Sequence, residues 1–136
     1  MNILVDTSIW SLAFRRKELS KDESKIIASL SELVKELRTV MIGPIRQEIL
    51  SGISDIKIFE ELQDKLSAFP DHLIETKDYE TAARFYNKCR KNGIQGSHID
   101  FLICAVASNN GFPVLTLDKD FLHYKKYLPI NLYKID

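Results

Sequence analysis

Asn2-Ile3-Leu4-Val5-Asp6-Thr7-Ser8 decides the fold, because an apolar run ends there at an acid and two hydroxyl residues. A short apolar run bounded by polar residues is typical of a buried strand, so we expect a strand over residues 2–5. Thr7 or Ser8 is suited to cap a short helix that continues to about Phe14. The opening of the chain therefore predicts a buried strand that leads directly into a helix, with the acid at the junction.

Short apolar runs alternate with longer stretches of helical period along the rest of the chain. Further strands are expected at 39–42, 72–75, 113–117 and, at an edge of the sheet, 131–135. The helices between them are expected to open at Asp22, Pro44, Ser54, Thr76 and Ser97, with a short last helix up to about Tyr124. Strands separated by helices indicate βαβ units. We therefore expect an α/β fold with three layers, α/β/α, around a mostly parallel central sheet.

Composition limits the class of protein. The chain has 136 residues, of which 45% are hydrophobic and 28% are charged, which suits one folded domain over residues 1–136 and argues against disorder. Lys plus Arg and Asp plus Glu number 19 each, so the net charge is zero and a strongly basic nucleic-acid binder is excluded. Contact with nucleic acid would have to come from local basic patches at 15–17, 88–91 and 125–126.

Targeting signals and cysteines point to the cytoplasm. No apolar run approaches the roughly 20 residues that span a bilayer, and the first residues lack the basic region of a signal peptide. Cys89 and Cys104 are too few for a disulfide framework, and they form no Cys-x-x-Cys pair. We expect a cytoplasmic protein with no membrane segment.

Four acids stand where strands end or helices begin. Asp6 and Asp118 each follow an apolar strand, and the carboxyl ends of parallel strands meet at one rim of a sheet. Asp100 lies in the first turn of a strongly apolar helix, and Glu48 lies one turn into the helix that opens at Pro44. Each acid also has a structural explanation, as a cap, a turn residue or a side chain that reaches solvent.

Convergence of the four acids would require a cation. At 5–6 Å, each charged pair repels by roughly 3 kcal/mol at an effective dielectric constant of about 20. Six such pairs together rival the stability of a domain, about 5–15 kcal/mol, unless a cation or retained protons offset the repulsion. Oxygen-only ligands favour Mg²⁺ or Mn²⁺ over Zn²⁺, and one or two such ions can activate water for attack on a phosphodiester.

The order of these elements resembles a known family. The pattern has four elements: the opening strand with Asp6-Thr7-Ser8, Glu48 after Gly43-Pro44, Asp100 at the start of a helix, and Leu115-Thr116-Leu117-Asp118-Lys119-Asp120-Phe121. This arrangement is similar to PIN-domain nucleases over essentially the whole chain and, at this length, to the VapC-type toxins of toxin–antitoxin pairs.

The resemblance implies a metal-dependent endoribonuclease. It implies that Asp6, Glu48, Asp100 and Asp118 are catalytic and hold Mg²⁺ or Mn²⁺, directly or through water. Thr116 and Thr7 would support the site. Asp120 is a further acid that can replace Asp118 as a ligand or cap the last helix. The implied partners are an RNA substrate, a second copy of the chain in a homodimer, and a cognate antitoxin that covers the acidic pocket.

Two other functions fit parts of the pattern. A phospho-accepting receiver domain also has an acidic, Mg²⁺-binding rim, but it needs paired acids after its first strand, where this chain has only Asp6. A PIN-fold binding module without catalysis would keep the fold alone.

Three side chains have two interpretations each. Arg46 can meet a phosphate or pair with an acid. Trp10, with Phe14 one turn away, can stack on bases or belong to the core. His98 can aid proton transfer or serve packing.

Overall fold

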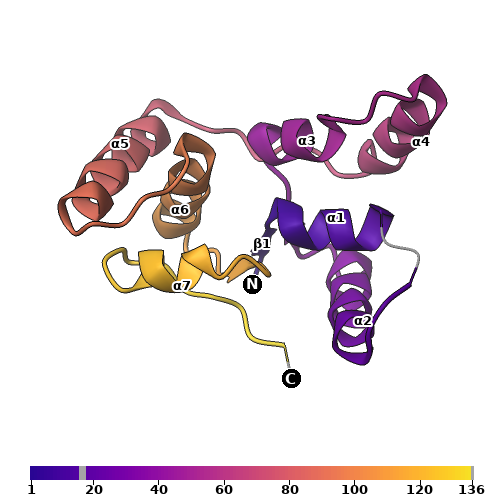
Figure 1. The fold of residues 1–136 in the computed structure, drawn as a ribbon, viewed down its shortest axis with the longest axis horizontal. Coiled ribbons are helices and arrows are strands. Elements are labelled where there is room, and N and C mark those ends of the chain that lie inside the picture. Colours follow the sequence, from indigo (N-terminus) through magenta and orange to yellow (C-terminus); the bar gives the residue numbers. More distant parts are fainter. Residues whose placement is uncertain (16–17, 136) are drawn as a thin grey trace.

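A parallel sheet of three short strands lies at the centre of the molecule (Figure 1). The computed structural model of the chain describes residues 1–15 and 18–135, so Arg16 and Lys17 of the first basic patch lie outside the described residues. The central strand is β1 (Ile3–Val5), which pairs in parallel with β2 (Thr39–Val40) and β3 (Val114–Leu115). All three residues of β1 are fully buried, as the apolar opening of the chain predicts.

Both edges of the sheet are shorter than predicted. The expected strands at 72–75 and 131–135 are each reduced to one parallel bridge, Met41 with Asp71 and Val114 with Leu132. The first segment leaves the sheet after this bridge: Leu73 is 79% exposed, although Ile74 packs against the core. The second has little to pair with, because β3 ends at Leu115 before the chain turns away. The prediction of two further strands was therefore wrong.

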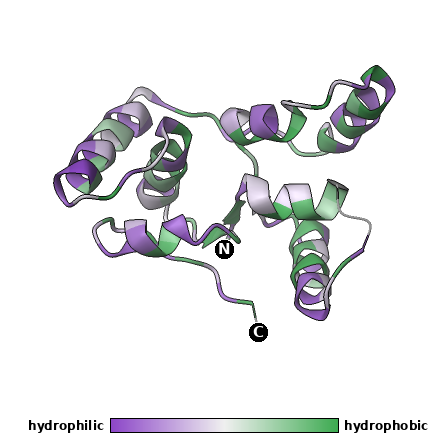
Figure 2. Ribbon diagram, viewed as in Figure 1, coloured by the Kyte–Doolittle hydropathy of each residue, from purple (hydrophilic) through white to green (hydrophobic). Residues whose placement is uncertain are grey.

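Helices flank the sheet on both sides, which confirms the predicted three-layer α/β fold. In the part of the chain that the structure describes, they are α1 (Thr7–Arg15), α2 (Lys21–Lys35), α3 (Gly43–Leu50), α4 (Ile56–Leu66), α5 (Thr76–Lys91), α6 (His98–Asn110) and α7 (Asp120–Lys125). In Figure 1, α5, α6 and α7 lie to one side of β1, and α1 to α4 lie to the other. The sheet is largely hydrophobic and the outer helix α5 largely hydrophilic (Figure 2).

The helix α3 begins at Gly43, one residue before the expected Pro44, and the caps of three other helices also differ from the predictions by one or two residues. Ser20, not Asp22, caps α2, and its side chain forms a capping box with Glu23. Asp55 caps α4 through the N–H of Ile58, and Glu75 precedes Thr76 at the start of α5. In each case a neighbouring oxygen-bearing side chain takes the position that the pattern assigned to another polar residue. Ser97 caps α6 as predicted.

The apolar helix α6 is the centre of the core. Its residues from Phe101 to Ala107 are all at most 8% exposed, as predicted for a central helix. Cys104 on this helix and Cys89 on α5 are free, buried thiols, and burial raises the pKa of both. None of the helices in the described ranges is long and apolar enough to cross a membrane.

Trp10 belongs to the core. It is 1% exposed, and its Nε1 donates a hydrogen bond to the carbonyl of Val5 at 3.1 Å. Its ring stacks on Phe14, with centroids 5.9 Å apart, and contacts Phe69 at 4.8 Å. Trp10 therefore joins α1 to β1 and to the segment after α4, and it is not available to stack on a base.

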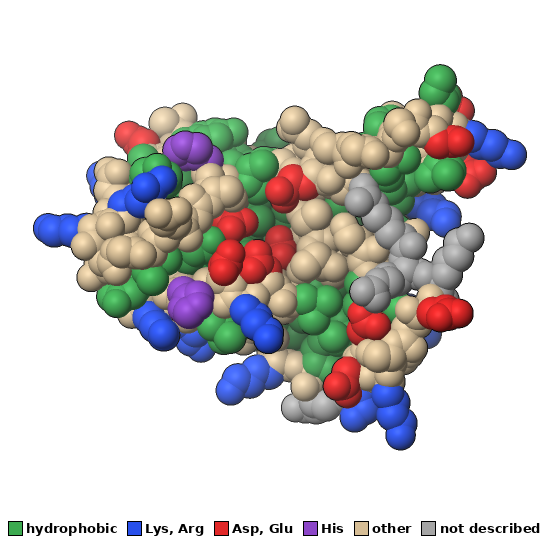
Figure 3. Space-filling view, viewed as in Figure 1, with side chains coloured by type: hydrophobic (Ala, Val, Ile, Leu, Met, Phe, Trp, Pro, Cys, Tyr) green, Lys and Arg blue, Asp and Glu red, His purple; other side chains and the backbone are tan. Residues whose placement is uncertain are grey.

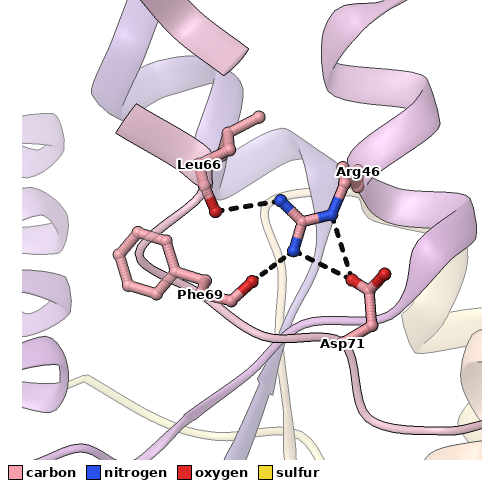
Figure 4. A network of polar contacts seen from close by, with 4 residues as sticks. All are labelled: Arg46, Leu66, Phe69 and Asp71. Atoms are coloured by element: carbon pink, nitrogen blue, oxygen red, sulfur yellow. Dashed lines mark hydrogen bonds and ion pairs between the residues drawn. The ribbon is translucent and has the colours of Figure 1, made fainter. Parts of the chain in front are cut away.

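Arg46 on α3 pairs with an acid (Figure 4). Its Nε and Nη2 donate to Asp71 Oδ1 at 3.0 and 2.9 Å, Nη1 donates to the carbonyl of Leu66 at 2.9 Å, and Nη2 also donates to the carbonyl of Phe69. One guanidinium thus attaches the segment that follows α4 to α3, the helix that carries Glu48. Between the two roles considered for Arg46, the structure selects the ion pair.

Candidate functional site

Three carboxylates from separate parts of the chain meet at one place. Asp100, Asp118 and Asp120 each offer a carboxylate oxygen, and these oxygens lie within 4.8 Å of one another. Asp100 comes from the first turn of α6, Asp118 from the loop after β3, and Asp120 from the first residue of α7. Figure 3 shows acidic side chains gathered near the middle of the visible face, beside hydrophobic ones.

Local hydrogen bonds explain how the sequence places these acids. The Ser97 hydroxyl accepts from the N–H of Asp100 at 3.0 Å and fixes the start of α6. Asp118 Oδ1 accepts from the N–H of Asp120 at 2.9 Å, which closes the turn into α7 and brings both carboxylates to one side. Both Asp118 and Asp120 belong to the cluster, so the geometry does not favour one of them over the other as a metal ligand.

Asp6 lies against this cluster at the end of β1. It is 5% exposed, and its Oδ2 accepts hydrogen bonds from the hydroxyls of Ser8 at 2.9 Å and Thr116 at 2.7 Å. Its main chain is fixed as well, because its N–H donates to the carbonyl of Leu115 and its carbonyl accepts from Ile9 in α1. The strand–helix junction thus holds a buried carboxylate at the rim where β1 and β3 end.

Thr116 connects the acids that follow the two strands. Its hydroxyl donates to Asp6 Oδ2 and accepts from the N–H of Asp118 at 2.9 Å. Ser8 adds a second connection, since its hydroxyl accepts from the N–H of Leu117 at 3.0 Å. Two hydroxyl side chains therefore fix the relative positions of β1, β3 and their acids.

We predict that Thr116→Val lowers divalent-metal affinity or activity by about 10- to 100-fold, the usual effect of removing a group that orients a ligand. Valine has nearly the same shape, but it can neither donate to Asp6 nor accept from the N–H of Asp118. Calorimetric titration with Mn²⁺ measures the change, and Thr76→Val on the surface of α5 is the control. Equal affinities of Thr116→Val and the unmodified protein would show that the hydroxyl has no such role.

Glu48 takes a different place from the one expected. Its Oε1 accepts from the Thr7 hydroxyl at 2.7 Å, so Glu48 joins the site through the residue that follows Asp6. The group of oxygens within 4.8 Å consists of Asp100, Asp118 and Asp120, and it includes neither Glu48 nor Asp6. The sequence pattern treated four acids as equivalent, whereas in the structure Asp100 and Asp118 cluster with a fifth acid, Asp120, and Asp6 and Glu48 flank the cluster.

The environment of Asp100 disfavours its charged form. Burial raises the pKa of this carboxyl above its ordinary value of 3.8, and the negative charges of Asp118 and Asp6 raise it further. The hydrogen bond from Tyr124 acts in the opposite direction without cancelling the shift. Asp100 is therefore an acid whose ionised form a bound cation would stabilise.

This shift predicts how the stability of the metal-free protein depends on pH. Above pH 3.8, the folded state keeps a proton on Asp100 that the unfolded state has lost, so this contribution to stability declines as pH rises through the raised pKa. We expect Asp100→Asn to flatten that decline, and Mg²⁺ to stabilise the unmodified protein more at neutral than at acid pH. Melting temperatures of both proteins from pH 4 to 8, in chelator and in Mg²⁺, measure this. Parallel curves for the two proteins would contradict it.

Tyr124 on α7 is a site residue that the sequence analysis missed. Its hydroxyl donates to Asp100 Oδ2 at 2.6 Å, and the ring is fully buried. Burial and the neighbouring Asp100 raise the pKa of the Tyr124 hydroxyl, so it stays a proton donor. The available signal was that a buried tyrosine needs a hydrogen-bond partner, but the sequence does not show which one. His98, by contrast, stacks on Tyr86 with centroids 4.9 Å apart.

The donor set fits a hard divalent cation. The clustered ligand atoms are carboxylate oxygens only, which suits Mg²⁺ or Mn²⁺ rather than a thiol- or imidazole-seeking metal. Acids outside the cluster, Glu32, Glu36 and Asp71, form ion pairs with basic side chains of the described residues. At 4.8 Å, each pair of charges repels by about 1 kcal/mol in water and about 3 kcal/mol at an effective dielectric constant of 20, which a bound cation would offset.

Comparison with known proteins agrees with this arrangement. Residues 3–127 match the PIN domain family. The chain belongs to the PIN domain family. This confirms the family predicted from the sequence, and it leaves the receiver-domain alternative without support. No curated protein is similar enough to this PIN domain in sequence to count as a relative.

Several solved structures share the fold of this PIN domain. FitAcB from Neisseria gonorrhoeae has a TM-score of 0.77 at 17% identity, over 97% of this chain and 96% of that one. VapBC2 from Rickettsia felis, crystallised with a DNA fragment from their promoter, has a TM-score of 0.74 at 17% identity over all of both chains. VapBC-5 from Mycobacterium tuberculosis, a member of the VapBC family of toxin–antitoxin systems, has a TM-score of 0.68 at 17% identity over 98% of both chains.

Proposed function

We propose that this PIN domain is an endoribonuclease that hydrolyses RNA phosphodiester bonds with Mg²⁺ or Mn²⁺. The observation that carries the proposal is the cluster of Asp100, Asp118 and Asp120, whose oxygens lie within 4.8 Å of one another, with the buried Asp6 against it. Phosphate is itself negative, so a face with this much acid can receive RNA only through a cation. PIN-family membership supports the nuclease activity over a module that only binds.

The residues of the site have separate tasks in this mechanism. Asp100, Asp118 and Asp120 hold the ion, and Asp6 completes the negative surroundings from the end of β1. A divalent cation bound there supplies charge stabilisation for the phosphate and a lower pKa for its water. Glu48 keeps one oxygen on the Thr7 hydroxyl, and its other oxygen serves to orient the attacking water.

The proposed partners follow from the structural neighbours and the fold. Two of the similar structures are VapBC assemblies, and one of these is named as a toxin–antitoxin system. We propose that this chain is the toxin of such a pair, that it forms a homodimer, and that a cognate antitoxin covers the acidic site. We further propose that the protein acts in the cytoplasm.

Cleavage of labelled single-stranded RNA by the purified full chain tests the function. We expect cleavage with Mg²⁺ or Mn²⁺ and none with chelator, and a single-stranded DNA of the same sequence reports the preference for RNA. Cleavage that persists unchanged in chelator would contradict the role of the metal. Metal binding without any cleavage of RNA would favour the catalytically silent binding module.

A further inference from the structure

The hydroxyl of Tyr124 is held in a single position. It donates to Asp100 Oδ2 at 2.6 Å, and the fully buried ring packs on Phe101 and Phe121, with both centroid distances 5.1 Å. An aromatic ring between two others cannot swing its hydroxyl elsewhere without repacking the core. The contact with Asp100 is therefore part of the fold.

Gly96 closes the remaining space around this hydroxyl. A Cβ at position 96 would lie 2.6 Å from the Tyr124 hydroxyl and 2.9 Å from the Phe101 ring. Because glycine has no Cβ, the main chain just before α6 can lie close to the Tyr124 hydroxyl. The Tyr124 hydroxyl is thus closely surrounded, and it donates to the carboxylate of Asp100.

A similar contact occurs at three further acids of the site. Asp118 Oδ1 accepts from the N–H of Asp120, Asp6 Oδ2 accepts from two hydroxyls, and Glu48 Oε1 accepts from Thr7. Each of these carboxylates has one oxygen engaged by the protein, as Asp100 has through Tyr124. Asp100 and Asp118 belong to the cluster, and the second oxygen of each is the natural donor to an ion.

Carboxylates that offer one oxygen discriminate between divalent cations. Mg²⁺ requires near-ideal octahedral coordination and binds through one or two carboxylates and several waters. Ca²⁺ takes six to eight oxygens and often uses both oxygens of a carboxylate. A site in which Asp100 and Asp118 each have one oxygen held by the protein therefore penalises Ca²⁺ more than Mg²⁺ or Mn²⁺.

We infer that Tyr124 is a specificity-determining residue of the metal site, which selects Mg²⁺ and Mn²⁺ against Ca²⁺ by occupying one oxygen of Asp100. The inference rests on the proposed metal-dependent function. Tyr124→Phe removes only the hydroxyl oxygen that donates to Asp100 and keeps the buried ring in place, so it isolates this contact. It acts through Asp100, so it is a positioning residue and not a catalytic one.

Metal titration of the full chain tests the inference without any nuclease assay. Calorimetry gives the Kd for Mn²⁺ and for Ca²⁺, and the ratio of the two is compared between the unmodified protein and Tyr124→Phe. We expect the preference for Mn²⁺ to fall by about tenfold in Tyr124→Phe, within the range seen when a ligand-orienting group is removed. Tyr79→Phe on the exposed side of α5 is expected to leave the ratio unchanged.

A change in the ratio cannot come from loss of folded protein, which would weaken both metals alike. An unchanged ratio in a folded Tyr124→Phe would overturn the inference and leave the proposed function intact. Absence of binding by the unmodified protein would overturn the proposed function itself. If Tyr124→Phe fails to fold, Gly96→Ala takes its place, because a Cβ at position 96 displaces the same hydroxyl. A smaller preference of Gly96→Ala for Mn²⁺ over Ca²⁺ then supports the inference, and an unchanged preference contradicts it.

Discussion

Asp100→Asn is expected to lower the rate of RNA cleavage by about 10²- to 10³-fold. A divalent ion contributes several kcal/mol of charge stabilisation to phosphodiester hydrolysis, and each 1.36 kcal/mol corresponds to a tenfold change in rate. The asparagine keeps the shape of the side chain and can still accept a hydrogen bond from Tyr124, but it carries no negative charge for the ion. Initial rates on a labelled RNA in Mg²⁺ measure the effect.

The matched control for this substitution is Asp64→Asn on the exposed surface of α4, which removes the same charge away from the cluster. We expect that control to cleave RNA like the unmodified protein, and Asp6→Asn to lose activity as Asp100→Asn does. If Asp6→Asn and Asp100→Asn both cleave at the normal rate, the assignment of the active site is wrong.

Trp10→Ala is expected to reduce the free energy of unfolding by about 3–5 kcal/mol, as large aromatic truncations in a core do. That is a large part of the roughly 5–15 kcal/mol that stabilises a domain. The substitution removes the stacking on Phe14, the contact with Phe69 and the hydrogen bond to Val5 together. Urea unfolding followed by far-ultraviolet circular dichroism is the suitable measurement, because the variant has lost the only tryptophan of the chain.

Trp10→Phe is the control, since it keeps an aromatic ring in the core and loses mainly volume and the hydrogen bond to Val5. Its loss of stability is expected to be clearly smaller. A Trp10→Ala protein with an unchanged urea midpoint and weaker RNA binding would restore the base-stacking interpretation that the buried position of Trp10 argues against.

The sequence predicted those parts of the fold that depend on local pattern. β1 and α6 were correctly expected to be central, because every residue of β1 and every residue of α6 from Phe101 to Ala107 is apolar. The edges of the sheet were wrong, because residues 72–75 and 131–135 have the composition of strands but find too little neighbouring strand to pair with. Such pairing depends on where the chain turns, for example at Thr116, which no local pattern encodes.

The sequence predicted where in the fold the candidate site lies, but not which side chains form the cluster. Acids at strand ends and at the start of α6 identified Asp6, Asp100 and Asp118 as neighbours. The role of Tyr124 and the equal standing of Asp120 depend on how α7 folds back onto α6. Glu48 was placed with the other acids because periodicity gives the face of a helix but not the hydroxyl, here that of Thr7, that a side chain meets.

The order of the strands has a consequence for biosynthesis. β1 precedes both of its partner strands in the sequence, yet it lies between them, and Thr116 joins Asp6 across a separation of 110 residues. Contacts between residues so far apart in the sequence form late, because the long loop between the two residues must close first. A nascent chain therefore carries Asp6 long before Asp118 is translated. For the proposed nuclease, this order delays assembly of the acidic site until most of the domain has been translated.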